Sequence, residues 1–506
     1  MIFKVGGVIV YLGILLWLGV LASRRMKDIK DYFAAGKNLG FLAVAFSARA
    51  TGESAWLLIG LTGMGCALGV KAFWVVVGEV IGVVGAWLFM SKRFKRLTDQ
   101  YDSITVPDYL ESRFQDKSQI IRIVSAFALT IFVTIYVSAQ IDATGKAFED
   151  FLGWNYYAGI AVGFAVVATY ITSGGFLAVA WSDMFQGALM FLGLVILPIV
   201  AIASMGGVAA LTDGLSKIDV SLLSVTGGTG WTPIATAEIL GLALIGLGFL
   251  GSPQIFVRFI ALKDESEIPK GAWVAFIWTL LADGGAVLVG MAGRVMLTGD
   301  SGDMSVFGGA EAVLPALVEH VFPALIVGIY IAIVLSAIMS TVDSLLVLAG
   351  SAAVRDWYQK VKNPTISDED LVGLSRKVTF GLALGGLAVA LAVAISTPDR
   401  TVFWFVIFGW SGISATFCPV MILSLFWPGL TGRGVVAGMV TGFFAVPFFK
   451  FGISNLPGIG EFFSALSELP PSFAMAFLAA IVVSLTDKKG QSIVAQAAED
   501  LKSASR

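Results

Sequence analysis

The sequence predicts an all-α protein that crosses a membrane many times. Of its 506 residues, 57% are hydrophobic and only 13% are charged, whereas soluble globular proteins carry about 25% charged residues. The 58 glycines allow helices to pack closely in lipid. This composition excludes a soluble enzyme, a nucleic-acid-binding protein and a disordered chain, and the net charge of −2 implies no polyanionic partner.

Apolar runs give the expected membrane helices. A helix crosses the hydrocarbon core, roughly 30 Å thick, in about 20 apolar residues. The first run occupies the position of a signal peptide, but its length and the basic residues after it favour an uncleaved span. The thirteen predicted spans are 4–23, 41–66, 72–90, 120–148, 156–174, 180–205, 234–260, 272–297, 322–351, 376–396, 402–427, 433–452 and 470–486.

Basic residues predict how these spans are oriented. If the N-terminus lies outside, most of the 33 lysines and arginines fall in segments on the cytoplasmic side. That bias is the positive-inside rule, and it predicts an outer N-terminus, an inner C-terminus and thirteen crossings. We therefore expect a multi-pass protein of the cell membrane, the inner or plasma membrane.

The spans divide the chain into six expected parts. Two five-helix halves with opposite orientation form the arrangement of an inverted repeat. The parts are an extra first helix with a cytoplasmic link (1–40), the first repeat (41–205), an outer loop (206–233), the second repeat (234–427), two peripheral helices (428–487) and a short cytoplasmic tail (488–506).

Two spans contain sequences that interrupt a membrane helix. The second is polar and rich in small residues from Ser47 to Trp56, and the seventh contains Pro253 after Gly251 and Ser252. Unwound backbone near the bilayer midplane offers carbonyls to a cation and N–H groups to an anion. The spacing Gly246-x-Gly248-x-x-Gly251 matches a dinucleotide fingerprint only formally, because no strand precedes it.

Adjacent hydroxyls end the ninth span. Ser340 and Thr341 could supply oxygens to sodium together with carbonyls of a broken helix. Alternatively, both hydroxyls bond back to their own helix. Asp343 follows toward the cytoplasm, where it could cap the helix or line an exit path.

Ionisable residues within spans are the other signal, because a charge at the bilayer centre costs roughly 3 kcal/mol. Arg49 and Glu53 could neutralise each other at i, i+4. If the helix breaks at Thr51-Gly52, Arg49 could instead meet Asp142 or a solute carboxylate. Asp183 either caps the sixth span or has a function.

Few residues suggest enzymatic chemistry. The chain has one histidine and two cysteines, and both cysteines lie in apolar runs. No nucleophile–base pair or metal-ligand set is visible, so we expect no enzyme. Trp56 and Tyr136 flank the polar stretches and are better candidates for a binding pocket than for lipid contact.

Together, these motifs resemble those of the sodium:solute symporter family, particularly its bacterial sodium/proline symporters. The resemblance runs from Asp31 to Gly432 and implies a LeuT-type inverted repeat that imports a small organic solute with sodium by alternating access. The stretches that carry it are 31–40, Val106-Pro107-Asp108-Tyr109 with Arg113-Phe114, 174–179 with Trp181-Ser182-Asp183, Gly251-Ser252-Pro253 with Arg258-Phe259, and Met339-Ser340-Thr341.

The resemblance also implies site residues. Sodium would be held by carbonyls of Ala50 and Glu53, by Ala337, and by the hydroxyls of Ser340 and Thr341. Asp183 would mark a second sodium or coupling position, to which we add Asp343. Sodium is the co-transported ion, and no organic cofactor, nucleic acid or obligate protein partner is expected. The solute pocket would comprise Thr51, Ser54, Ala55, Trp56, Tyr136, Phe249, Pro253 and Gln254.

Departures from the family pattern concern the solute rather than sodium. The carboxylate of the second span is at Glu53, where proline symporters have it one residue earlier, at the position of Gly52. Ile245 and Phe249 replace a tryptophan and a tyrosine. We therefore expect proline or another amino acid as the solute, with a sodium- or proton-coupled symporter of a different charged or zwitterionic solute, such as an organic acid, as the alternative. A charged network of Arg49, Glu53 and Asp142 would contact that solute.

Overall fold

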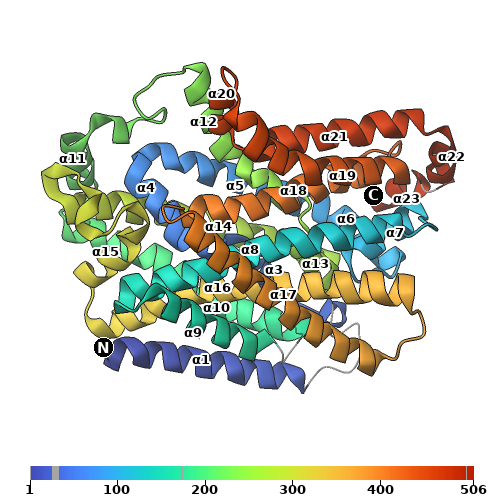
Figure 1. Ribbon diagram of the computed structural model, residues 1–506, viewed down its shortest axis with the longest axis horizontal. Helices are drawn as coiled ribbons and strands as arrows, with labels where there is room; N and C mark the ends of the chain where they lie inside the picture. Colours follow the sequence, from blue (N-terminus) through green and yellow to red (C-terminus); the bar gives the residue numbers. More distant parts are fainter. Residues whose placement is uncertain (1, 25–33, 172–174, 497, 506) are drawn as a thin grey trace.

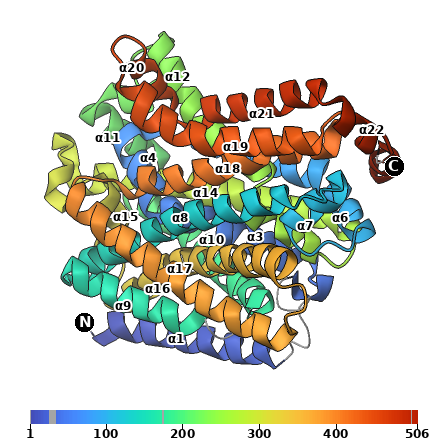
Figure 2. The same cartoon turned by 45° about the vertical axis from the view of Figure 1, so that its right-hand side comes forward.

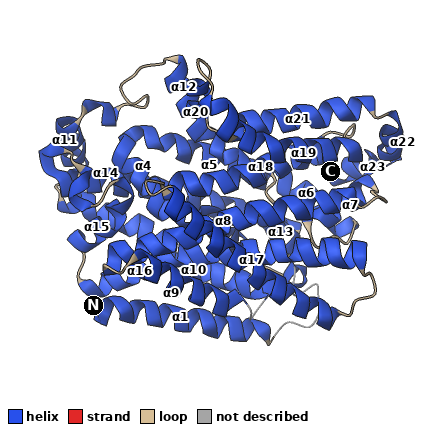
Figure 3. Cartoon of the chain, in the orientation of Figure 1, coloured by secondary structure: helices blue, strands red, loops and turns tan. Residues whose placement is uncertain are grey.

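The chain is helical throughout the part that the computed structural model describes, which is residues 2–24, 34–171, 175–496 and 498–505. Figure 3 shows helices and loops in these ranges and no strand, apart from one isolated bridge between Leu39 and Leu262. The all-α prediction is confirmed. Residues 25–33 of the expected cytoplasmic link, and Gly174 of the family motif, lie outside the described residues.

Long helices follow the predicted apolar runs. Their apolar side chains favour burial in lipid or against one another, and proline or glycine ends several of them. The ones that do not continue into another helix type are α1 (Ile2–Ser23), α8 (Ile120–Leu152), α9 (Tyr156–Ile171), α10 (Gly175–Ser204), α14 (Ile268–Thr298), α17 (Asp368–Ser396), α18 (Val402–Phe426) and α21 (Leu469–Thr486). Three others continue into a π-helix: α5 (Phe73–Gly85) into η4 (Ala86–Met90), α16 (Ala324–Ser351) into η11 (Ala352–Lys362), and α19 (Gly432–Pro447) into η12 (Phe448–Gly452).

Two runs are interrupted, and these are the two that the sequence singles out. In the first, α3 (Phe41–Ala55) is followed by η2 (Trp56–Leu61) and α4 (Thr62–Leu68). Ser54 has φ 49° and ψ −164°, so its peptide groups leave the helical pattern. In the second, α12 (Pro233–Ala243) continues into η6 (Leu244–Leu250). Gly251, whose φ of 150° suits only glycine, then separates η6 from α13 (Pro253–Ala261).

Eleven helical stretches in the described residues are long and apolar enough to cross a membrane. One of them, Phe41–Gln100, has 60 residues and covers the second and third predicted spans. The fifth predicted span corresponds to α9, which contains a shorter apolar stretch, Tyr156–Ala165. The count of thirteen, the orientation in the membrane and the boundaries of the two repeats stay predictions.

The connecting helices gather at two opposite ends of the bundle. Figures 1 and 2 place the N-terminus at one end, near α15 (Val313–Val321) and α11 (Val208–Ile218), which belong to the predicted outer loops. The C-terminus lies at the other end, near α6, α7, α22 and α23 (Ser91–Gln100, Val106–Phe114, Lys488–Gln496, Ala498–Ser505). The predicted odd number of crossings would place the termini at opposite ends in this way.

Burial ranks the helices from the centre to the edge. The most apolar windows of α16 and α18 are 83% and 89% buried, whereas that of α1 is 22% buried. α16 and α18 therefore lie at the centre, where they contact α3 and α8, and α1 lies along the edge (Figure 1). Side chains of the predicted sites are consequently shielded from lipid.

Candidate functional site

The ninth predicted span meets the interrupted second span through hydroxyl groups. Ser340 of α16 donates to the carbonyl of Ala50 at 3.0 Å, and Thr341 donates to the carbonyl of Thr51 at 3.1 Å. Both hydroxyls also lie within 3.3 Å of the carbonyl oxygen of Ala337. The structure thus brings together oxygens of four of the five predicted sodium-binding residues, in a region without solvent exposure.

Both interpretations of the hydroxyl pair are visible in these contacts. Bonds to Ala337 are the back-bonds that such hydroxyls make within a helix, and bonds to α3 cross between helices. Glu53 stands apart: its carbonyl accepts the backbone N–H of Trp56 at the end of α3. A sodium ion that took the place of these hydrogen bonds would find hard oxygen ligands from two helices.

Asp183 lies within α10 and not at its start, so it is not a helix cap. Its carboxylate accepts hydrogen bonds from Ser47 at 2.7 Å and Thr51 at 3.2 Å. Arg258 of α13 donates to the same oxygen at 2.9 Å and also to Ser344 at 2.5 Å. This buried cross-link joins α3, α10, α13 and α16.

Arg258 was not among the predicted site residues, although it lies in a family motif. Its Nη2 also donates to Thr51 at 2.6 Å, so this threonine faces the Asp183 network rather than the predicted solute pocket. Asp343 precedes Ser344 on α16, and its carboxylate accepts the backbone N–H of Ser344 at 2.6 Å. A charged residue inside a predicted membrane span, 234–260, is the signal that could have identified Arg258.

Several predicted pocket residues surround the break at Ser54. Tyr136 of α8 donates to the Ser54 hydroxyl at 3.4 Å. Gln140, one turn further along α8, accepts the backbone N–H of Ala55 at 3.0 Å and donates to Ser54 at 3.3 Å. The ring of Trp56 meets that of Phe403 edge-on, with centroids 6.0 Å apart. Gln140 and Phe403 were not predicted.

Phe249 of η6 packs against α3 at Gly52. A Cβ on Gly52 would approach the ring of Phe249 to 2.7 Å, so the absence of a side chain on Gly52 leaves space for the phenyl group. Trp410 of α18 packs against the same ring with a centroid distance of 5.0 Å and donates to the carbonyl of Ile245 at 3.0 Å.

Pro253 and Gln254 begin α13 just after the second break. Both are buried. Among the described residues, neither the amide nitrogen nor the amide oxygen of the Gln254 side chain has a hydrogen-bond partner. A buried amide without partners suits a polar ligand.

Arg49 is surrounded by acids of three helices. It pairs with Glu53 of α3, and its Nη2 lies 3.7 Å from both Glu79 of α5 and Asp283 of α14. Carboxylate oxygens of the three acids lie within 4.8 Å of one another, and all are buried. The guanidinium carbon is 4.8 Å from the centroid of Phe249. Because the break falls at Ser54 and not at Thr51-Gly52, the i, i+4 pair persists.

Asp142 does not join this cluster. Among the described residues it pairs with Arg400, next to α18, and accepts a hydrogen bond from Tyr156 of α9. The predicted network of Arg49, Glu53 and Asp142 is therefore corrected: Glu79 and Asp283 take the place of Asp142. Glu79 and Asp283 lie within the predicted spans 72–90 and 272–297, but spacing along the chain could not join three helices.

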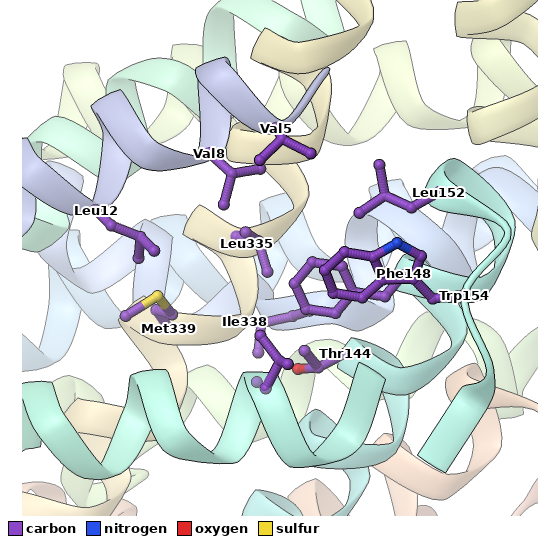
Figure 4. Close-up of a pocket in the computed structure, with 12 residues that line it drawn as sticks. Val5, Val8, Leu12, Thr144, Phe148, Leu152, Trp154, Leu335, Ile338 and Met339 are labelled. Carbon is purple, nitrogen blue, oxygen red and sulfur yellow. The ribbon is translucent and has the colours of Figure 1, made fainter. Parts of the chain in front are cut away.

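Figure 4 shows an apolar cavity of about 70 Å³ that lies outside this region. Val5, Val8 and Leu12 of α1 face Leu335, Ile338 and Met339 of α16 across it. None of the residues predicted to bind the solute lines it. It is a packing gap beside the edge helix rather than a solute site.

Comparison with known proteins places this arrangement in a family. A sequence profile of the sodium:solute symporter family matches residues 32–442. The chain belongs to this family. It is 33% identical over 490 residues to the high-affinity proline transporter PutP of Bacillus subtilis strain 168, covering 95% of this chain and 98% of that protein. The sodium/proline symporter of Escherichia coli strain K12 is 32% identical over 486 residues, which cover 95% and 92% of the two chains.

Solved structures agree on the fold. A substrate-bound outward-open Na⁺-coupled sialic acid symporter has a TM-score of 0.77 at 18% identity, covering 96% of this chain and 98% of that one. MhsT in complex with L-phenylalanine has a TM-score of 0.50 at 17% identity, covering 87% and 98%. The symporter has the LeuT fold. It is a multi-pass plasma-membrane transporter, not an enzyme, and couples uptake of a small solute to sodium.

Proposed function

We propose that this symporter imports proline or another amino acid by alternating access. The names of the relatives support this proposal, because proline transport is attributed to both bacterial proteins above. The hydroxyls of Ser340 and Thr341 on the carbonyls of α3 are the observation that carries sodium coupling. No organic cofactor, nucleic acid or obligate protein partner enters the proposal.

The proposed sodium site comprises Ala50, Ala337, Ser340 and Thr341, with Glu53 contributing its carbonyl once the Trp56 N–H moves away. Asp183 and Asp343 are proposed to act in coupling, because Asp183 links four helices and Asp343 precedes Ser344 in the same network. Proton coupling is an alternative, in which an acid of the Arg49 cluster takes up the proton.

The proposed solute pocket lies at the two breaks. It comprises Ser54, Ala55, Trp56 and Tyr136 at one break, and Phe249, Pro253 and Gln254 at the other. The cluster around Arg49 adjoins it through Phe249. A buried guanidinium with three carboxylates favours a charged or zwitterionic solute, so an organic acid is the second candidate.

Uptake of radiolabelled proline into proteoliposomes tests the proposal. With an inward sodium gradient we expect uptake that a potassium gradient does not support. Unlabelled amino acids and organic acids then compete with proline, and the strongest competitor identifies the solute class. Uptake driven by a proton gradient without sodium would refute sodium coupling.

Arg49→Gln and Glu53→Gln, singly and together, test the charged cluster. If the cluster contacts the solute, each single variant weakens the apparent solute affinity by about tenfold or more, which corresponds to about 1.4 kcal/mol. Thermal unfolding of each variant controls for a purely structural role. Unchanged affinity in both single variants would contradict solute contact.

A further inference from the structure

A groove of about 890 Å³ lies at the end of the bundle that holds the C-terminus, and none of the residues that line it belongs to α3, η6 or α13. It is formed by the turn between α7 and α8, by the start of α19, and by α22. Three basic side chains, Lys117, Arg433 and Lys489, line it together with three exposed apolar ones, Ile120, Val440 and Ile493.

Basic side chains outnumber acidic ones in the groove, because Lys117, Arg433 and Lys489 face only two carboxylates, Asp116 and Asp487. Asp116 uses its two carboxylate oxygens to accept N–H groups of its own turn, from Ser118 at 3.1 Å and Ile121 at 2.8 Å. Asp487 lies 3.6 Å from Arg433, whose side chain remains 75% exposed. Within the described residues, Lys117 and Lys489 have no acidic partner within 4 Å. The groove therefore attracts an anion.

The apolar side of the groove continues along two membrane helices. Beyond Ile120, α8 exposes Ile123 and Phe127, and beyond Val440, α19 exposes Phe444. α8 and α19 contact each other, and the rings of Phe127 and Phe443 lie 5.4 Å apart. A ligand with an anionic head in the groove thus has an apolar path that leads into the hydrocarbon core.

We propose that this groove binds the phosphate headgroup of an anionic phospholipid of the cytoplasmic leaflet. The side of the membrane follows from the basic residues, which predict that these three segments are cytoplasmic. Basic pockets of this kind, at the membrane border and between helices, suit anionic headgroups. Free phosphate shares the headgroup chemistry but gains nothing from the apolar path along α8 and α19.

Lipid titration of the full-length protein, followed by native mass spectrometry, tests this proposal. The probes are dioctanoyl phosphatidylglycerol, dioctanoyl phosphatidylcholine and inorganic phosphate. We expect phosphatidylglycerol to bind at least about tenfold more tightly than the other two. The triple variant Lys117→Gln, Arg433→Gln, Lys489→Gln should weaken phosphatidylglycerol binding at least about tenfold and leave phosphatidylcholine binding unchanged.

Two further variants separate the groove from general surface charge. Lys360→Gln with Lys362→Gln removes two exposed lysines from the predicted cytoplasmic side outside the groove, and it should leave phosphatidylglycerol binding unchanged. Val436→Trp fills the groove without altering charge and should weaken the same binding. Equal binding by the wild type and the triple variant overturns the proposal, as does phosphate binding as tight as that of phosphatidylglycerol.

Discussion

At the scale of single residues, hydroxyl and charged side chains decide how the central helices meet. Ser340 and Thr341 use their hydroxyls twice, toward their own helix and toward α3. Arg258 satisfies Asp183 and three hydroxyl groups with one planar guanidinium. A lysine could not reproduce this fork of donors.

Removing either hydroxyl should weaken sodium binding. We expect Ser340→Ala and Thr341→Ala each to raise the sodium concentration for half-maximal uptake by about tenfold, because a bond to a charged group contributes about 1.5–3 kcal/mol. Ser336→Ala is the matched control, since Ser336 lies on the same helix and its hydroxyl donates to the carbonyl of Ala332 in that helix rather than to a carbonyl of α3. A sodium dependence as in the wild type in both variants would contradict the proposed site.

At the scale of helices, a buried charge cluster joins α7, α8 and η11 (Ala352–Lys362) at the end that holds the C-terminus. Arg122 donates to Asp108 at 2.6 Å and to Asp356 at 3.0 Å, and Arg355 donates to Asp108 at 3.1 Å. Burial raises the pKa of Asp108, but the two guanidinium groups outweigh it and hold that pKa below its usual value. The cluster therefore fixes α7 against the membrane helices.

This cluster predicts acid sensitivity. Because the pKa of Asp108 is lower in the folded protein than its usual value of about 3.9, its contribution is complete above that value and is lost as pH falls through the folded-state pKa. At pH 6, Asp108→Asn should lower the free energy of unfolding by about 3 kcal/mol, and the difference from the wild type should shrink below about pH 4. Thermal unfolding in detergent measures this.

The exposed Asp399 supplies the control for that measurement, since Asp399→Asn should leave stability unchanged at both pH values. A difference between wild type and Asp108→Asn that stays constant from pH 6 to below pH 4 would exclude ionisation of Asp108 as its source.

At the scale of the whole molecule, the two broken segments contact the two most buried membrane helices. α16 and α18 form the centre, and sodium and solute sites are proposed where they meet α3 and η6. Ligands that bind this folded arrangement and not the unfolded chain must stabilise it.

Sodium should therefore raise the melting temperature relative to potassium at equal ionic strength. At a sodium concentration a hundred times the dissociation constant, the expected stabilisation is about 2.7 kcal/mol. Thermal unfolding in detergent, with Ser340→Ala beside the wild type, measures this effect. A rise of equal size in that variant would assign it to general ionic interactions.

The sequence by itself determined the helical membrane fold, the positions of its apolar runs and the two segments that break. These properties follow from hydropathy and from proline or glycine, which act along the chain. The hydroxyl pair and the intramembrane charges could likewise be identified one by one.

Only the tertiary structure decided which of these residues meet. Arg49 faces Glu79 and Asp283 because α3, α5 and α14 pack together, and Asp142 faces Arg400 because α8 turns that side toward the start of α18. Arg258, Gln140 and Phe403 enter the site in the same way. The physical reason is that contacts between residues far apart in the chain depend on helix packing and rotation, which local sequence patterns do not specify.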